Sequence, residues 1–309
     1  LFITTSAAVI LLGTLYPLVV DAFGAGKVSV GPPFFNATFV PLMIPVMLAC
    51  TVGAMMSWKR TDLGGVLTRL KVACWGSIIV IGVVAWVTNV SELFAAFGFG
   101  VAAWLILGSA SELSERIALF HGSAENIWHR VKGLPRSAWG MAIAHGALGI
   151  LVVGITASSA FQVEKIQLVR PGDQINVAGY KITFDGVKPI TGPNYSAAQG
   201  QFTVRKDKTV ITILRPEKRN YPAEQNSTSE ASIRTTLLGD LYAVLGDRVS
   251  DGAWIARIYF NPLVAWIWIG AMLMAAGGLI SLTDRRYRIG IPKQAKIQQK
   301  FSISDITGP

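Results

Sequence analysis

The sequence has few charged residues and almost no cysteine. Only 15% of its 309 residues are charged, well below the quarter typical of soluble domains, whereas 51% are hydrophobic. This composition excludes an ordinary soluble domain and predicts a membrane protein. The two cysteines, Cys50 and Cys74, form no CxxC or CxxCH motif. Their isolation argues against a disulfide framework, a zinc site and covalent attachment of c-type haem.

The chain also lacks an initial methionine and a signal-peptide cleavage pattern. It opens directly in an apolar run from Leu1 to Val20, so we expect a fragment or one piece of a split protein. The formal net charge of +10 is compatible with nucleic-acid binding. However, many of the cations lie in loops between apolar runs, where membrane topology accounts for them. We therefore expect no nucleic-acid partner.

Six apolar segments approach the length of about 20 residues that a helix needs to span a hydrocarbon core. They are residues 1–20, 37–57, 72–88, 92–110, 139–158 and 263–282. Lys and Arg are concentrated after the second, fourth and sixth segments, which places those loops in the cytoplasm by the positive-inside rule. The fold class predicted is an α-helical polytopic membrane protein with about six transmembrane helices and an inserted β-rich external domain.

The predicted domains follow from these segments. Residues 1–158 hold transmembrane helices one to five, residues 159–262 the external domain, residues 263–284 the sixth helix, and residues 285–309 a basic cytoplasmic tail. Apolar and polar residues alternate between about 163 and 222, which favours strands. Leucines and valines from Ser229 to Asp247 recur at helical spacing and predict a helix. Because no His or Cys follows His145, the external domain offers no Ser/His/Asp or Cys/His catalytic set, and docking is its expected role.

The fifth apolar segment contains an ionisable residue, His145. An ionisable side chain inside a membrane helix is costly and is a functional-site hypothesis by default. Imidazole is too short to reach the headgroups from about 9 Å below Trp139. It therefore needs a partner within the bundle: a metal, a haem iron, a proton path or a hydrogen-bonding side chain. The small residues Ala142, Gly146 and Gly149 leave either a flat space for a porphyrin or a surface for close helix packing.

The other two histidines lie in a predicted cytoplasmic loop. His121, Glu125 and His129 have an H-x3-E-x3-H spacing that places all three on one side of a helix. No fourth ligand or supporting shell is evident in the sequence. We therefore interpret these side chains as solvated or headgroup-facing.

Several motifs, taken together and in order, resemble the CcmF family of haem-lyase subunits in bacterial cytochrome c maturation. They are TLYPLV (14–19), GKVSVGPPFFN (26–36), AWGMAIAHGALG (138–149), RTTLLGDLYAVLGD (234–247) and YFNPLVAWIWIGAMLMAAGGLISLTDRR (259–286). The resemblance covers nearly the whole chain and matches the C-terminal half of the family. It implies location in the bacterial inner membrane with the β-rich domain in the periplasm.

The resemblance also implies a function. Family members attach haem, delivered by the chaperone CcmE, to the CxxCH motif of apocytochrome c, together with CcmH-type thiol-reducing subunits. They carry a separate b-type haem (haem b) in the membrane, and one axial ligand of that haem is the histidine of a helix like AWGMAIAHGALG. In this chain that residue is His145.

Parts of the family pattern are absent. The tryptophan-rich WWD segment, two external haem-ligating histidines and the other ligand of haem b belong to the family's N-terminal half. WIWIG at 266–270 has no Asp and lies within a helix, so it does not replace the WWD segment. The N-terminal half of CcmF is therefore an expected partner, and without it Met47 or Met272 would have to serve as the second axial ligand.

Two further groups are candidate binding residues. Arg136, at the start of the fifth span, is a candidate for a haem propionate, although the positive-inside rule explains it equally well. The segment Pro32, Pro33, Phe34, Phe35 and Asn36 is expected in an external loop. This loop either lines the site where substrate haem meets apocytochrome c or simply anchors the second helix.

Two alternative functions remain open from the residues. In a transporter, His145 would act as a proton relay beside the proline-broken helices. In a plain b-type electron carrier, the haem would have no role in haem attachment.

Overall fold

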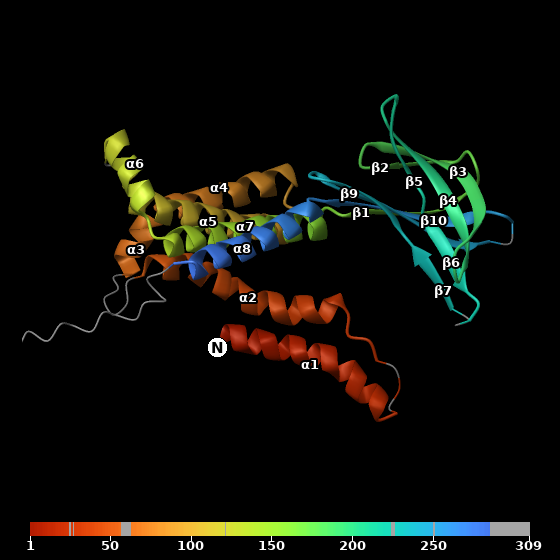
Figure 1. Ribbon diagram of the computed structural model, residues 1–309, viewed down its shortest axis with the longest axis horizontal. Helices are drawn as coiled ribbons and strands as arrows, with labels where there is room; N and C mark the ends of the chain where they lie inside the picture. Colours follow the sequence, from red (N-terminus) through yellow and green to blue (C-terminus); the bar gives the residue numbers. More distant parts are fainter. Residues whose placement is uncertain are drawn as a thin grey trace, which may run out of the picture.

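The computed structural model describes residues 1–24, 26, 28–56, 63–120, 122–223, 226–249 and 251–284. The chain forms a helical bundle at one end and a β domain at the other (Figure 1). The β domain is inserted between the last two bundle helices, α7 and α8. The predicted basic tail and the cations Lys59 and Arg60 lie outside the described residues.

In the described part of the chain, the bundle and its ends consist of eight helices: α1 (Phe2–Ala22), α2 (Pro32–Met55), α3 (Leu63–Arg69), α4 (Lys71–Val87), α5 (Leu93–Ile117), α6 (Ala124–Gly133), α7 (Arg136–Ala160) and α8 (Val264–Leu282). Among the described residues, five helices are long and apolar enough to cross a membrane: α1, α2, α5, α7 and α8. The sixth predicted span is α4, an apolar helix of 17 residues. The prediction of a polytopic helical membrane protein is confirmed.

Two helices differ from the predicted spans for identifiable local reasons. Helix α2 begins at Pro32 rather than at residue 37, because a proline in the first turn loses no helical hydrogen bond. Helix α5 continues to Ile117, seven residues past the predicted end, and stops where Ala118 adopts the left-handed conformation. This extension puts the charged residues Glu112 and Arg116 on the helix.

Glycines set the spacing between bundle helices. A Cβ at Gly140 of α7 would lie 2.4 Å from the carbonyl oxygen of Gly277 on α8, and a Cβ at Gly277 would lie 2.6 Å from that of Gly140. The two backbones therefore touch directly, as small residues allow in membrane helices. At the same end, the Ser137 amide donates to Asp284 Oδ2 at 3.0 Å, so a carboxylate lies at the positive end of α7.

The connections alternate between the two ends of the bundle. The link from α1 to α2, the link from α4 to α5 and the β domain lie at one end, whereas α3 and α6 lie at the other (Figure 1). This arrangement agrees with the predicted alternation of loops. Helix α6 is capped by Ser123, whose hydroxyl accepts from the Asn126 amide.

The described residues of the β domain form ten antiparallel strands: β1 (Val163–Val169), β2 (Gln174–Val177), β3 (Tyr180–Thr191), β4 (Ser196–Lys206), β5 (Thr209–Leu214), β6 (Glu217–Tyr221), β7 (Asn226–Glu230), β8 (Ser232–Thr236), β9 (Gly239–Arg248) and β10 (Trp254–Pro262). One sheet has the order β1-β10-β9-β8, and the other β2-β3-β4-β6-β7, with β5 paired to β4. Apolar side chains from both sheets, including Phe184 and Phe202, form one buried core.

The predicted helix from Ser229 to Asp247 is wrong: these residues form parts of β7 and β9 and the whole of β8. Leu241, Ala243 and Leu245 are all buried at every second position, which is strand periodicity. Leu237 and Leu238 lie at the hairpin turn and are exposed. Combining the turn leucines with the strand leucines produced the apparent helical spacing.

Candidate haem-ligand site in the helical bundle

Helix α7 positions His145 well inside the bundle. The residue lies nine positions after Arg136, about 13–14 Å along the helix axis. Its side chain is half-buried. Helix α7 contacts α5 along one side and α8 along the other, through glycines on each. Because α7 packs closely against both α5 and α8, the position of His145 along the bundle is fixed.

The imidazole of His145 has no hydrogen-bond partner in the part of the chain that the structure describes. It does lie near enough to Glu112 of α5 to interact with it electrostatically. No group of three or more His, Cys, Asp or Glu side chains suited to a metal is found among the described residues. The described chain thus offers one nitrogen donor, His145, that can take one axial position on an iron.

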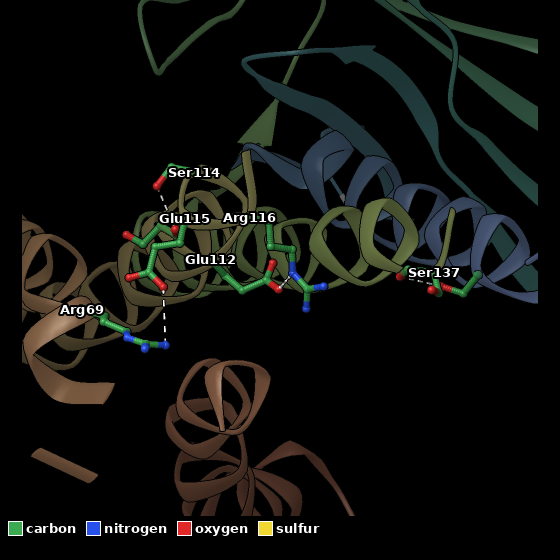
Figure 2. Close-up of polar contacts among 8 residues, drawn as sticks. Arg69, Glu112, Ser114, Glu115, Arg116 and Ser137 are labelled. Carbon is green, nitrogen blue, oxygen red and sulfur yellow. Dashed lines mark hydrogen bonds and ion pairs between the residues drawn. The ribbon is translucent and has the colours of Figure 1, made fainter. Parts of the chain in front are cut away.

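Glu112 was not among the site residues predicted from the sequence, yet it is the carboxylate that interacts with His145. It is only 5% exposed and forms an ion pair with Arg116, one helical turn further along α5 (Figure 2). Glu115 of the same helix lies 3.7 Å from Arg69 and is much more exposed. The sequence does contain a signal for Glu112: Arg116 follows it four residues later, just after the apolar run, and such pairs interact on a helix.

The small residues near His145 have different neighbours. A Cβ at Gly149 would lie 2.8 Å from the carbonyl oxygen of Ala102, so α5 fills the space beside Gly149. For Gly149 the structure thus favours close helix packing, the second of the two interpretations given above. Gly146 is less crowded, since a Cβ there would meet Ser109 only at 3.8 Å, and Ala142 is buried. For these two residues haem contact stays a prediction.

Arg136 lies at the first position of α7 and is exposed. Arg136 and His145 are nine positions apart, which corresponds to two and a half turns, so the two side chains leave the helix on opposite sides. This geometry is unfavourable for a salt bridge between Arg136 and a propionate of a haem bound to His145.

The segment Pro32 to Asn36 is not a loop, which corrects the sequence prediction of its conformation. All five residues belong to the first turns of α2. Phe34 and Phe35 meet edge to face, and both rings contact the position of Gly13 on α1. The aromatic pair thus joins α1 to α2 at the end of the bundle where the β domain lies (Figure 1).

The remaining described candidate ligands lie on other helices than His145. Met272 is 63% exposed on α8. Gly270 and Gly277 of α8 contact α7, and Met272 is two residues from Gly270, about 200° around the helix. Met47 packs against the apolar cluster of Val101, Ala102, Leu105 and Val152, from α5 and α7. His129 and Glu125 lie on exposed helix α6, and His121 lies outside the described residues.

The β domain carries a groove of about 460 Å³ on the face of β9 and β10 that points away from its core. Residues lining it include Gln162, Lys218, Tyr242, Asp247, Arg257 and Tyr259. Lys218 and Asp247 form an ion pair at 3.0 Å across it. The hydrogen bond from Tyr259 to Glu164 raises the pKa of the Tyr259 phenol. The groove presents donors and acceptors suited to docking.

Fold and site together define a polytopic membrane protein with a β-sandwich inserted before its last span. In the described part of the bundle, one imidazole has no hydrogen-bond partner. Residues 160–262 match the family model described as the CcmF C-terminal beta-sandwich. The cytochrome c-type biogenesis protein CycK of Rhizobium meliloti is 42% identical over 296 residues, which cover 96% of this chain and 44% of that protein. CcmF of Escherichia coli is 35% identical over 93% of this chain and 43% of its own length.

A solved structure described as cytochrome c heme lyase CcmF has a similar fold, with a TM-score of 0.65 and 23% identity over 91% of this chain and 44% of that one. This chain belongs to the CcmF family of cytochrome c-type biogenesis proteins and corresponds to the C-terminal half of its members. It spans less than half the length of the relatives that it matches.

Proposed function

We propose that this chain is the C-terminal part of a cytochrome c haem lyase and that His145 is an axial ligand of a b-type haem in the membrane. The observation that carries the proposal is the half-buried imidazole of His145, which has no hydrogen-bond partner among the described residues of an apolar bundle. A neutral imidazole binds iron through one nitrogen, while its other nitrogen needs an acceptor that fixes the ring.

The rest of the site must come from elsewhere in the protein. Met272 faces away from α7, and the described chain offers no second histidine near His145. We assign the second axial ligand to the N-terminal half of the protein, as the family resemblance implies. In the proposal, CcmE delivers substrate haem, CcmH-type subunits present reduced apocytochrome c, and the β domain lies in the periplasm of a bacterial inner membrane.

The absorption and EPR spectra of the purified protein test this proposal. With the N-terminal half present, we expect a low-spin b-type spectrum with two histidine ligands. When this chain is prepared alone, that spectrum should be absent or change to a five-coordinate form, because one donor is missing. A protein with the N-terminal half that binds no b-type haem would contradict the proposal and leave the transporter hypothesis as the better one.

Glu112→Gln should raise the reduction potential of the haem by tens of millivolts. The buried carboxylate near His145 stabilises the more positive ferric state, and its removal also leaves Arg116 as an uncompensated cation. A change of about 1 kcal/mol corresponds to roughly 40 mV for one electron. Redox titration followed by absorbance measures the shift. Glu115→Gln is the matched control, since exposed Glu115 is screened by solvent; an equal shift in both variants would refute a specific effect of Glu112.

Phe34→Ala combined with Phe35→Ala should lower cytochrome c assembly severalfold while the membrane haem spectrum is retained, if the pair lines the substrate-haem site. Assembly is measured by haem staining of c-type cytochromes in cells. Both rings also contact α1 at Gly13, so Gly13→Ala, whose methyl group would crowd them, serves as the packing control. Equal losses in the double variant and in Gly13→Ala would show that the aromatics only hold α1 against α2.

A further inference from the structure

The turn between β8 and β9 is apolar and exposed. Thr236 pairs with Gly239 across the hairpin, so the turn consists of two residues, Leu237 and Leu238. Their exposed fractions are 66% and 76%. Two-residue hairpin turns usually hold Asn, Asp or Gly, because these residues tolerate the backbone and interact well with water. Two adjacent exposed leucines at such a point indicate a binding surface rather than a turn suited to solvent. We call these two residues the leucine tip.

The leucine tip is hydrogen-bonded to the start of helix α8. The Leu263 amide donates to the Leu238 carbonyl at 3.1 Å, and Trp266 Nε1 donates to the Leu237 carbonyl at 2.9 Å. Both carbonyl oxygens of the tip are thus held by residues at the beginning of α8. Because α8 is one of the helices able to cross a membrane, the tip lies level with the first turn of a span. In Figure 1 the β9 end of the hairpin reaches back to α8.

The hairpin presents its leucines rigidly. Thr236 Oγ1 donates to the Gly239 carbonyl at 2.7 Å and accepts from the Gly239 amide at 3.2 Å. Gly239 has a φ of +156°, and a Cβ there would lie 2.8 Å from the carbonyl oxygen of Asn261. The close approach of the tip to β10 therefore depends on glycine. A turn closed in this way cannot fold its leucines back into the domain.

We propose that the leucine tip inserts into the lipid bilayer beside the first turn of α8. The partner is the boundary between the headgroups and acyl chains, where tryptophans such as Trp266 are enriched and apolar side chains leave water. The tip gives the β domain a third attachment to the membrane, in addition to its two chain connections to α7 and α8. This contact fixes how the β domain is tilted over the bundle.

Site-specific fluorescence quenching in lipid nanodiscs tests the proposal. Cys50 and Cys74 are first replaced by Ser, and a single cysteine is introduced as Leu238→Cys, or as Leu237→Cys in a second preparation, and labelled with an environment-sensitive fluorophore. Val210→Cys is the control, since Val210 is 50% exposed on β5, a different strand of the β domain. Each sample is titrated with nitroxide-bearing lipid and, separately, with aqueous iodide.

We expect lipid nitroxide to quench the probe at 238 at least severalfold more than the probe at 210, and iodide to show the reverse order. Quenching by iodide at 238 equal to that at 210 would show the tip in water and overturn the proposal. Resistance of the 238 probe to both quenchers would show the tip covered by protein, which also overturns it. The same criteria apply to the probe at 237, so that a local defect of one labelled variant does not decide the result.

Discussion

His145→Ala should abolish the b-type haem of the full-length protein, with occupancy falling by more than about tenfold. The loss of a direct ligand is expected to exceed the roughly 10–100-fold cost of removing even an outer-shell partner. No other described His is available on the membrane-spanning helices to replace it. Haem content per protein, measured by the pyridine haemochrome spectrum after purification, checks the result.

His129→Ala is the matched control, because His129 lies on exposed α6 and should not change the haem content. A second variant, His145→Gly, separates ligand loss from misfolding: added imidazole should restore the low-spin spectrum by entering the vacated position. Wild-type haem occupancy in His145→Ala would disprove the assignment of His145. Failure of imidazole to restore the spectrum, with the protein still folded, would count against direct ligation.

Gly277→Leu should strongly destabilise the bundle by separating α7 from α8. A Cβ at Gly277 would lie 2.6 Å from the Gly140 carbonyl oxygen and 2.8 Å from the Ala144 amide nitrogen. These are backbone atoms and cannot move aside as a side chain can. Overpacking of this kind costs about 1–3 kcal/mol or more, so we expect the Tm to fall by several degrees. Thermal unfolding of the detergent-solubilised protein, monitored by tryptophan fluorescence, measures the shift.

Gly278→Leu provides a control of the same size on the neighbouring residue. Nothing lies within 4 Å of a Cβ at Gly278, so this variant should keep the wild-type Tm. Because α7 also carries His145, Gly277→Leu should lower haem occupancy as well. Equal Tm values for the two variants would show that direct backbone contact between α7 and α8 does not limit stability.

Much of the site could be predicted from the sequence, but its surroundings could not. His145 is conspicuous because it interrupts an apolar run, and that contrast is visible without coordinates. Glu112 is not conspicuous, since it lies just past the predicted end of its span and looks like a loop residue. Only the extension of α5 to Ile117 places it on a buried helix face near His145. The opposite directions of Arg136 and His145 likewise follow from the true start of α7.

In the β domain, too, the sequence predicted one part of the structure and not another, but for a different reason. Alternation within β3 and β4 predicted strands, because Ile182, Phe184, Phe202 and Val204 are all buried at every second position. The segment that holds β8 and β9 was mistaken for a helix. Its turn leucines look like core residues in the sequence, and only the hydrogen bonds to Leu263 and Trp266 show that the turn docks against α8.

The sequence by itself determined the class of protein: apolar runs of membrane length, one histidine within them and a strand-rich insertion before the last run. These features are local, because span length, charge placement and residue periodicity depend only on neighbours along the chain. The tertiary structure alone decided which small residues pack helices, which carboxylate lies near His145 and where the leucine tip docks. Those contacts join residues far apart in the sequence, and no local pattern encodes the helix faces that meet.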